Sequence, residues 1–341
     1  MKLFMPSRVI FDPYSLDYPL GKEIYSFFKN EPVEIIKATS NNASRYITGT
    51  TPAEKYANSM RTILITTNKN NKLDICRPSA DYQFSLVSNC PGNCEYCYLQ
   101  TTQGAKPYIK VFVNIEDIFD VIKQHIKQDE EITTFEAASL GDPLSLEHIT
   151  GSLAKTIDFF SDLEKGRLRV VTKFNNVDSL LTLKHNKQTQ FRISINTNYV
   201  INNFEHNTGS IDERIEALVK LANAGYPIGF LVAPLMIYHN WKREYYELFE
   251  KLQSQLGSNL SQEQMTFELI QHRYTAVAKD LILQRFPKTQ LDMEEENRSL
   301  KWGRFGRFKY VYPKEQADEI KEYLSFLIRE RFPKADIKYF T

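Results

Sequence analysis

Strands and helices are predicted to alternate regularly between Gln83 and Gln271. Short apolar runs rich in Val, Ile and Phe are separated by stretches whose apolar residues recur at helical spacing. The expected strands are 84–87, 133–138, 168–172, 191–195, 228–233 and 265–271, and the expected helices are 113–128, 146–163, 177–184, 211–224 and 241–256. Apolar runs this continuous are typical of parallel strands that helices cover on both faces. Because such strands cross over right-handed, six units predict an α/β fold, a partial (β/α)6 TIM-like barrel.

The segments on either side of this barrel indicate two smaller units. Residues 1–80 contain short strand candidates and an amphipathic helix at 20–28, which predicts a mixed α/β lobe before a barrel at 81–290. Residues 291–341 predict a β-hairpin at 301–312, a helix at 315–331 and a closing strand at 337–340. A chain of 341 residues with 42% apolar residues can bury the core that this organisation needs.

Charge and cysteine content limit the class of protein. The formal net charge of +1 does not indicate nucleic-acid binding, so an anionic partner would have to meet a local basic patch. Four cysteines, three of them in one loop, do not form a disulfide framework and favour a reducing cytoplasmic location. No apolar stretch reaches 18 residues, so we expect neither a secretory signal nor a membrane span.

Three cysteines, Cys90, Cys94 and Cys97, form a Cys-x3-Cys-x2-Cys motif just after the first barrel strand. Thiolates are the ligands preferred by iron–sulfur clusters, zinc and cuprous copper. A structural zinc ion or a ferredoxin-type cluster needs a fourth protein ligand, and the remaining cysteine, Cys76, stands alone upstream. The spacing therefore predicts a [4Fe–4S] cluster with three irons held by the protein and one left open. The alternative is a surface zinc knuckle or a chance grouping.

Several candidate residues lie at or just past the carboxyl ends of predicted barrel strands, where the chemistry of such barrels gathers. These residues are Ser139, Gly141, Asp142, Lys173, Ser194, Ala233, His272 and Arg273. Each has a plainer interpretation as well. Asp142 could cap the next helix, Lys173 could be solvated, and His272 could be packed in the core.

The predicted hairpin alternates cations with aromatic residues around two glycines, and it includes Arg304, Phe305 and Arg307. Cations pair with phosphates and aromatic rings stack on bases, so this pattern suits splayed or kinked nucleic acid. An ordinary aromatic hairpin packed on the barrel is the alternative.

Taken together, these residues resemble the spore photoproduct lyase family of the radical S-adenosylmethionine superfamily. The strings that carry the resemblance are the cysteine loop with Tyr96 and Tyr98, Val171-Thr172-Lys173, the segment 267–273, Lys301-Trp302-Gly303-Arg304 and Tyr339-Phe340-Thr341. The resemblance implies a carbon–carbon lyase for DNA repair. Such an enzyme cleaves S-adenosyl-L-methionine reductively to a 5′-deoxyadenosyl radical, which reverses a thymine dimer in DNA.

The resemblance also implies a role for each candidate residue. Cys90, Cys94 and Cys97 hold the cluster, and Tyr96 and Tyr98 relay the radical. The cofactor is lined by Tyr98, Gly141, Asp142, Lys173, Ser194 and Ala233, and Gly141-Asp142-Pro143 is similar to the Gly-Gly-Glu-Pro element of the superfamily. Lesion DNA is expected at His272, Arg273, Arg304, Phe305 and Arg307. The expected partners are damaged double-stranded DNA and an external reductant such as flavodoxin or ferredoxin.

One position departs from the family pattern. The family has a cysteine after Phe-Glu-Ala-Ala that donates hydrogen to the repaired thymine, and this chain has Ser139 there. A serine O–H bond is far stronger than a thiol S–H bond and is a poor hydrogen-atom donor. Cys76 could supply the hydrogen if it reaches the pocket, Ser139 could mark an engineered or slow variant, or the chain could be a paralogue with a different substrate.

Overall fold

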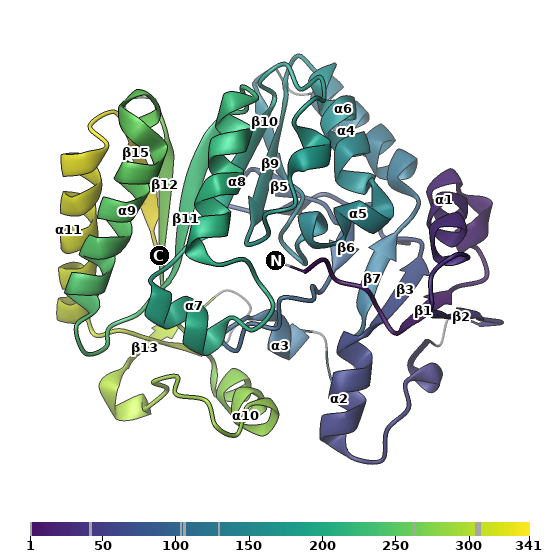
Figure 1. Ribbon diagram of the computed structural model, residues 1–341, viewed down its shortest axis with the longest axis horizontal. Helices are drawn as coiled ribbons and strands as arrows, with labels where there is room; N and C mark the ends of the chain where they lie inside the picture. The colour runs from purple at the N-terminus through teal and green to yellow at the C-terminus, as the bar shows by residue number, and fades with distance from the viewer. Residues whose placement is uncertain are drawn as a thin grey trace.

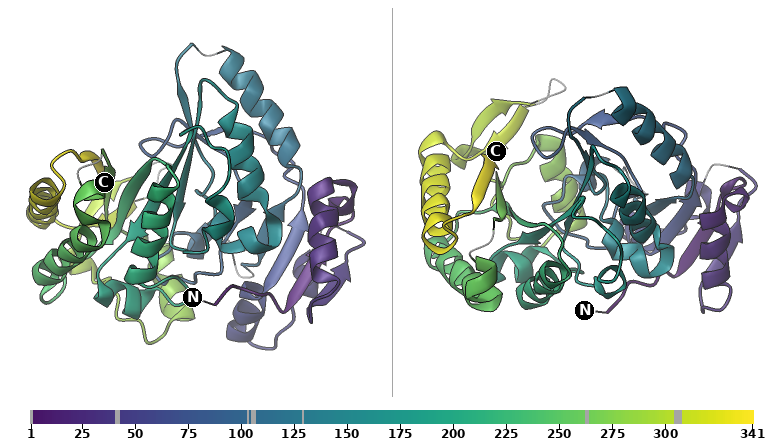
Figure 2. Two further views of the ribbon diagram at one scale, coloured as in Figure 1. Left: turned by 45° about the horizontal axis from the view of Figure 1, so that its top comes forward. Right: turned by 90° about the horizontal axis from the view of Figure 1, so that it is seen from above.

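The computed structural model describes residues 2–40, 43–102, 104, 107–128, 130–261, 264–303 and 308–341. The larger of its sheets has eight strands and curls around an interior (Figure 2). In spatial order the strands are β15 (Asp336–Phe340), β12 (Thr266–Gln271), β11 (Ile228–Leu235), β10 (Thr189–Ile195), β9 (Gly166–Thr172), β8 (Thr133–Glu136), β5 (Tyr82–Gln83) and β4 (Asp74–Ile75). Neighbouring strands are parallel except β4 and β5. The predicted partial α/β barrel is confirmed.

The first predicted barrel strand, 84–87, is wrong in its boundaries. The segment joins two sheets: β5 pairs with β8 in the barrel, and β6 (Val87–Ser88) pairs with β7 (Ile109–Phe112) in the smaller sheet. The backbone N–H of Phe84 still donates to the carbonyl of Glu136, at 3.0 Å. Because the chain changes sheet here, the cysteine loop that follows lies between the two sheets.

Helices cover the outer face of the barrel (Figure 1). They are α4 (Ile115–Gln128), α6 (Ser152–Ser161), α8 (Ile211–Asn223), α9 (Trp241–Ser261) and α11 (Lys314–Arg331). The predicted helix 146–163 is interrupted at Gly151, whose φ of 58° is left-handed, so α5 (Glu147–Thr150) is separate from α6. The predicted helix 177–184 is only the single turn η4 (Asp178–Leu180). Helix α8 ends before Gly225, as its pattern predicts.

The smaller sheet has the order β2-β1-β3-β7-β6 and lies beside α1 (Pro19–Phe28) and α2 (Pro52–Met60) (Figure 1). Its other strands are β1 (Arg8–Phe11), β2 (Glu34–Lys37) and β3 (Thr62–Thr66). The turns η1 (Ser15–Asp17) and η2 (Ala43–Tyr46) connect them. Helix α2 begins with a capping box formed by Thr51 and Glu54.

Strand pairing crosses the boundaries that we expected at residues 80 and 290. Strands β6 and β7 join the N-terminal sheet, while β4 and β15 join the barrel. Strand pairing alone does not define domain boundaries, so the division into 1–80, 81–290 and 291–341 stays a prediction. Among the described residues, none of the helices combines the length and the apolar character needed to cross a membrane.

Several short elements gather near the lower ends of the barrel strands in Figure 1. They are α3 (Leu99–Thr102), η3 (Pro143–Leu146), α7 (Asn198–Phe204), α10 (Ala276–Arg285), η5 (Glu295–Asn297), β13 (Ser299–Trp302) and β14 (Phe308–Val311). Strands β13 and β14 pair antiparallel, which confirms the predicted hairpin. These lower ends are the carboxyl ends of the parallel strands, where the candidate residues lie.

Candidate active site

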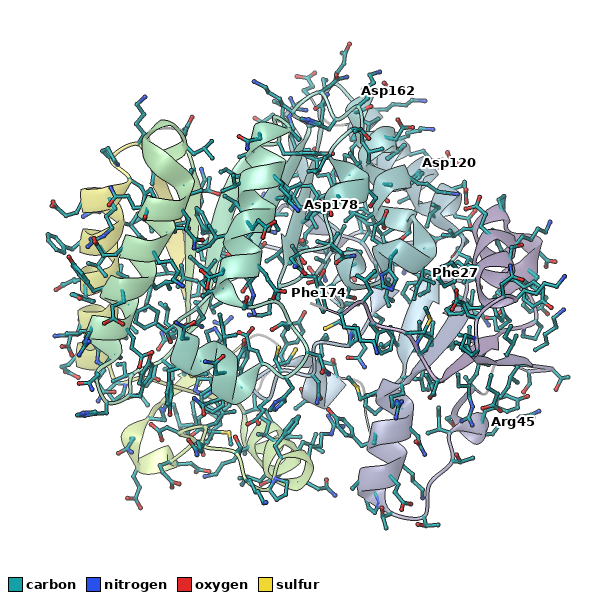
Figure 3. All side chains as sticks on the ribbon, in the orientation of Figure 1. Phe27, Arg45, Asp120, Asp162, Phe174 and Asp178 are labelled. Carbon is teal, nitrogen blue, oxygen red and sulfur yellow. The ribbon has the colours of Figure 1, made fainter. Side chains whose placement is uncertain are left out.

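Lys173 is the centre of the candidate site, one residue past β9. Its Nζ donates to Ser194 Oγ in β10 at 3.0 Å, to the carbonyl of Ala233 in β11 at 3.4 Å and to Glu205 Oε1 at 2.9 Å. The next residue, Phe174, is labelled at this edge of the sheet in Figure 3. Three residues that the sequence assigned to the cofactor therefore meet at one ammonium group.

Asp142 lies on the same edge, past β8. Its carboxylate accepts hydrogen bonds from Thr172 Oγ1 at 2.8 Å and from the backbone N–H of Lys173 at 3.0 Å. Asp142 is also the N-cap residue of η3, and the backbone N–H of Leu144 in η3 helps to lower the pKa of its carboxylate, so the capping alternative stays a prediction beside the cofactor role. Burial raises the pKa of Asp142 to about 6, although these hydrogen bonds oppose the shift. The neighbouring Gly141 packs on the backbone of the cysteine loop, since an added Cβ would lie 2.5 Å from the carbonyl oxygen of Asn89.

The three loop thiols face one another. Burial is the main cause of the raised pKa of each thiol, and it raises that of Cys97 to about 12. In each case a neighbouring thiolate of the motif adds to the shift, while the ammonium of Lys173 opposes it. Packing is also close, because a Cβ on Gly92 would lie 3.4 Å from Cys90 Sγ. The donor set is thus one buried thiol, that of Cys94, and two partly buried thiols beside one cation.

Three thiols from one loop suit a cuboidal cluster with one open iron, because each thiolate of such a cluster binds a different iron. A structural zinc ion needs a fourth protein ligand as well.

Glu205 is the main site residue that the sequence did not predict. Its side chain is 0% exposed and accepts hydrogen bonds from Lys173, Arg214 and Tyr96. Burial alone would raise its pKa, but the cations of Arg214 and Lys173 lower the pKa of Glu205 to about 2. Two signals point to this pair. Glu205 lies in a long connection after the strand 191–195, and Arg214 occupies the apolar face of the predicted helix 211–224.

Tyr98, Cys76 and Ser139 form a second group at the site. Cys76 Sγ lies 3.4 Å from Ser139 Oγ, so the thiol does reach the position of the missing cysteine. Tyr98 is 57% exposed, yet surrounding protein, followed by the thiols of Cys97 and Cys76, raises its pKa. Tyr96 differs because its hydroxyl donates to Glu205.

His272 and Arg273 point to opposite sides after β12. His272 is 3% exposed and lies beside Arg298, whose Nη1 donates to the carbonyl of His272 at 3.3 Å. Burial, then the Arg298 cation, lowers the pKa of His272 to about 3, so the imidazole is neutral. The packed alternative therefore describes His272, while Arg273 is exposed.

The predicted tip of the hairpin, with Arg304, Phe305 and Arg307, lies outside the described residues. The strands that carry it expose Trp302 and Phe308, whose rings meet edge to face with centroids 4.8 Å apart. An exposed aromatic pair therefore stands at the base of the tip.

An open α/β barrel with a three-cysteine loop and a partly buried lysine at its carboxyl edge defines the radical S-adenosylmethionine class, whose cofactors are a [4Fe–4S] cluster and S-adenosyl-L-methionine. The sequence model of the family described as "Spore photoproduct lyase" matches residues 4–341. The chain belongs to the spore photoproduct lyase family, a family of lyases.

Relatives and solved structures extend over the whole chain. Spore photoproduct lyase of a Geobacillus species is 47% identical over 100% of both chains, and that of Bacillus subtilis is 45% identical over 99% of both. The enzyme of Clostridium acetobutylicum is 42% identical over 97% of this chain and 98% of its own. This full-length similarity does not favour a paralogue with another substrate.

Three solved structures are informative. A spore photoproduct lyase with bound AdoMet and dinucleoside spore photoproduct has a TM-score of 0.96 at 47% identity, and it covers 100% of both chains. That protein carries one cysteine-to-alanine and one serine-to-cysteine replacement. A spore photoproduct lyase complexed with the dinucleoside alone gives a TM-score of 0.96, and a Tyr-to-Phe variant gives 0.95, each at 47% identity over 100% of both chains.

We expect Gly141→Ala to destabilise the protein by about 2 kcal/mol, the usual cost of inserting a methyl group against close-packed atoms. The added Cβ would push the Asn89 carbonyl away, and with it the start of the cysteine loop. Denaturant unfolding would measure the loss, and iron content after reconstitution should fall as well. Gly209→Ala is the control, because its nearest neighbour would lie at an ordinary 3.4 Å. Equal effects of the two variants would contradict the prediction.

We expect Glu205→Gln to lower the free energy of unfolding by roughly 3 kcal/mol, the scale for removing one partner of a buried ion pair. The amide would leave the fully buried Arg214 without its carboxylate. Denaturant unfolding at pH 7 provides the measurement. The control is Glu216→Gln, which breaks an exposed pair with Lys220 and should cost less than about 1 kcal/mol.

Proposed function

We propose that this chain reverses spore photoproduct in DNA, using Cys76 rather than Ser139 as the hydrogen-atom donor. The observation that carries the proposal is the meeting of Lys173, Ser194 and Ala233 beside the cysteine loop, with Cys76 at the same edge of the barrel. Support for the substrate comes from a solved relative, 47% identical, that binds AdoMet and dinucleoside spore photoproduct.

The site residues divide the work between binding and radical handling. Cys90, Cys94 and Cys97 would hold the cluster, and with S-adenosyl-L-methionine bound it supplies a carbon-centred radical from a one-electron reduction. Lys173 would hold the carboxylate of the cofactor, because its partly buried ammonium lies at the site and is held there by Glu205, Ser194 and Ala233. An external flavodoxin or ferredoxin would deliver the electron.

Asp142, Gly141 and Tyr98 would complete the cofactor pocket. Asp142 carries a carboxylate that can face an ammonium group, and its present bonds to Thr172 and Lys173 fix its direction. Gly141 allows the turn to approach the cysteine loop closely. Tyr98 would line the pocket on the side of Cys97 and Cys76, whose thiols add to its raised pKa.

The quenching step follows from the chemistry of the thiol. The S–H bond of Cys76 breaks homolytically, its hydrogen atom forms a C–H bond on the thymine radical, and a thiyl radical remains on sulfur. Tyr98 then gives its phenolic hydrogen atom to that sulfur and keeps the radical. Tyr96 would be the second tyrosine of this radical relay. Ser139 would leave room for the thiol and take no part in the transfer. Cys76 and Ser139 are one cysteine and one serine. The replacements in the solved relative likewise affect one cysteine and one serine.

Lesion DNA would lie across this edge of the barrel, with the hairpin over the damaged step. The exposed Trp302 and Phe308 can stack or wedge against bases, and Arg273 is free to face phosphate on the same side. The predicted contacts of Arg304, Phe305 and Arg307 belong to the same interface. We expect the protein to work in the cytoplasm, where cluster and reductant stay reduced.

Anaerobically reconstituted protein should convert an oligonucleotide containing one spore photoproduct to two thymines, with dithionite and S-adenosyl-L-methionine present. Liquid chromatography of the digested product measures the conversion. The matched control is Cys94→Ala, which removes one cluster ligand and should abolish conversion while the chain stays folded. Formation of 5′-deoxyadenosine without any thymine release would overturn the substrate and leave the radical chemistry intact.

Cys76→Ala should lower thymine release by roughly 100-fold, the scale for losing a correctly placed reacting group. Ser139→Ala should keep wild-type activity, because the hydroxyl donates no hydrogen atom. Adding Ser139→Cys to Cys76→Ala should restore most of the release, since the two positions lie 3.4 Å apart. Full activity of Cys76→Ala alone would exclude the donor role.

A further inference from the structure

We propose that Ser79 is a positioning residue that fixes the Cys76 thiol against Ser139 by anchoring its turn to a buried ion network inside the barrel. The catalytic part of this proposal rests on the donor role of Cys76 stated above. The anchoring itself rests only on contacts of the described residues.

The turn that carries Cys76 has little support from its own strands. Strands β4 and β5 pair over only two residue pairs at the edge of the sheet, and Ile75 beside Cys76 is 67% exposed. Within the turn, the carbonyl of Cys76 accepts from the backbone N–H of Ser79 at 3.0 Å, and the N–H of Cys76 donates to Asp81 at 3.1 Å. These bonds give the turn its shape but do not tie it to the barrel.

Ser79 supplies that tie through both its side chain and its backbone. Its Oγ accepts from Arg192 Nη1 at 2.8 Å and donates to Glu136 Oε2 at 3.2 Å. Its carbonyl accepts from Arg169. The three partners come from β10, β8 and β9, so one small residue connects an edge turn to three central strands.

The partners of Ser79 are themselves rigidly held. Arg192 and Glu136 are 1% and 2% exposed and form an ion pair, and Arg192 also binds Glu268 at 2.7 Å. Glu268 in turn pairs with Arg169 and accepts from Tyr339 at 2.7 Å. The two arginines balance the two glutamates, which is the condition for burying ionised groups. The Nε atoms of Arg169 and Arg192 have no hydrogen-bond partner among the described residues, but the ion pairs still restrict how the four side chains can be arranged.

Glu136 makes the network relevant to the reaction, because its two oxygens hold both walls of the donor site. Oε2 accepts from Ser79, three residues after Cys76, while Oε1 accepts from the backbone N–H of Ala138 at 3.1 Å, directly before Ser139. One carboxylate thus sets the separation between the turn with the thiol and the turn with the serine. Hydrogen-atom transfer is sensitive to such separations, since small displacements of reacting groups cost much of the rate.

Asp81 provides a second anchor, which explains why the turn would loosen rather than detach without Ser79. Its carboxylate accepts from the Thr134 hydroxyl at 2.7 Å and from the Thr134 N–H at 3.0 Å. This anchor lies five residues from Cys76, at the far end of the turn. Without the Ser79 hydroxyl, the Cys76 N–H still donates to the Asp81 carbonyl and the Ser79 carbonyl still accepts from Arg169. Removing the hydroxyl should therefore loosen the turn around Cys76 and leave β5 in place.

Ser79→Ala in the anaerobically reconstituted enzyme tests the proposal. The chain has four cysteines, and the cluster occupies three, so iodoacetamide should modify only Cys76. We expect the alkylation rate of Cys76, followed by mass spectrometry, to rise about 3-fold to 10-fold, as expected for a loosened local structure. During turnover, the ratio of 5′-deoxyadenosine formed to thymine released should at least double, because a displaced thiol quenches less efficiently.

Two further variants separate positioning from general damage. Ser161→Ala removes an equally small, buried hydroxyl in α6, which donates to Asp158 at 2.8 Å, and should change neither readout. Ser79→Thr keeps the hydroxyl, so its alkylation rate of Cys76 and its product ratio should stay close to those of the wild type. An unchanged alkylation rate in Ser79→Ala would overturn the anchoring. A raised alkylation rate with an unchanged product ratio would overturn the donor role of Cys76, so the two parts fail separately.

Discussion

The buried carboxylate of Glu205 is the interaction on which the site depends. An isolated carboxylate at this depth would be too costly to keep ionised, and it is stable here because Arg214 and Lys173 share its charge. This pairing also directs Lys173 toward Ser194 and Ala233. The backbone of Glu205 forms an isolated bridge with that of Cys94. Glu205 therefore connects Lys173 to the cysteine loop. A lysine surrounded by solvent would lack this connection.

The cysteine loop lies between two sheets because the chain changes from one sheet to the other just before it. Strand β6 leaves the barrel sheet for the smaller one, and the loop begins immediately afterwards. Asn207 holds the loop from the barrel side, with its N–H on the Gly92 carbonyl at 3.1 Å, and Tyr56 of α2 donates to Asn93 at 2.6 Å from the other side. These two bonds hold the loop between Cys90 and Cys94 from both sides, although the loop itself has almost no regular structure.

Periodicity predicted the barrel well because buried parallel strands leave a strong apolar signal. Strands β8 to β12 lie within a few residues of their predicted ranges. The position of catalytic candidates at strand ends followed from topology, and Lys173, Ser194 and Ala233 do meet there. Glu205, Arg214 and the Ser79 network were not predictable in this way. Their partners are distant in sequence, and a charged residue next to apolar ones does not identify the charge that neutralises it. Helix α2 was missed because its sequence is largely polar and only its capping box indicates it.

Two segments face each other at the position where the family cysteine is replaced by Ser139. One wall is the β4–β5 turn with Cys76, and the other is the turn after β8 with Ser139. A hydrogen-atom donor must reach the substrate radical, but the chemistry does not require it to come from β8 rather than from the β4–β5 turn. Cys76 and Ser139 are in contact, so a thiol on either wall can serve the same point in space. The wall that carries the thiol must then be rigid. A turn at the edge of a sheet is among the least constrained places in a barrel, and its rigidity here comes from the charges of the interior. The proposed donor role of Cys76 on this turn therefore depends on the buried network that extends to it.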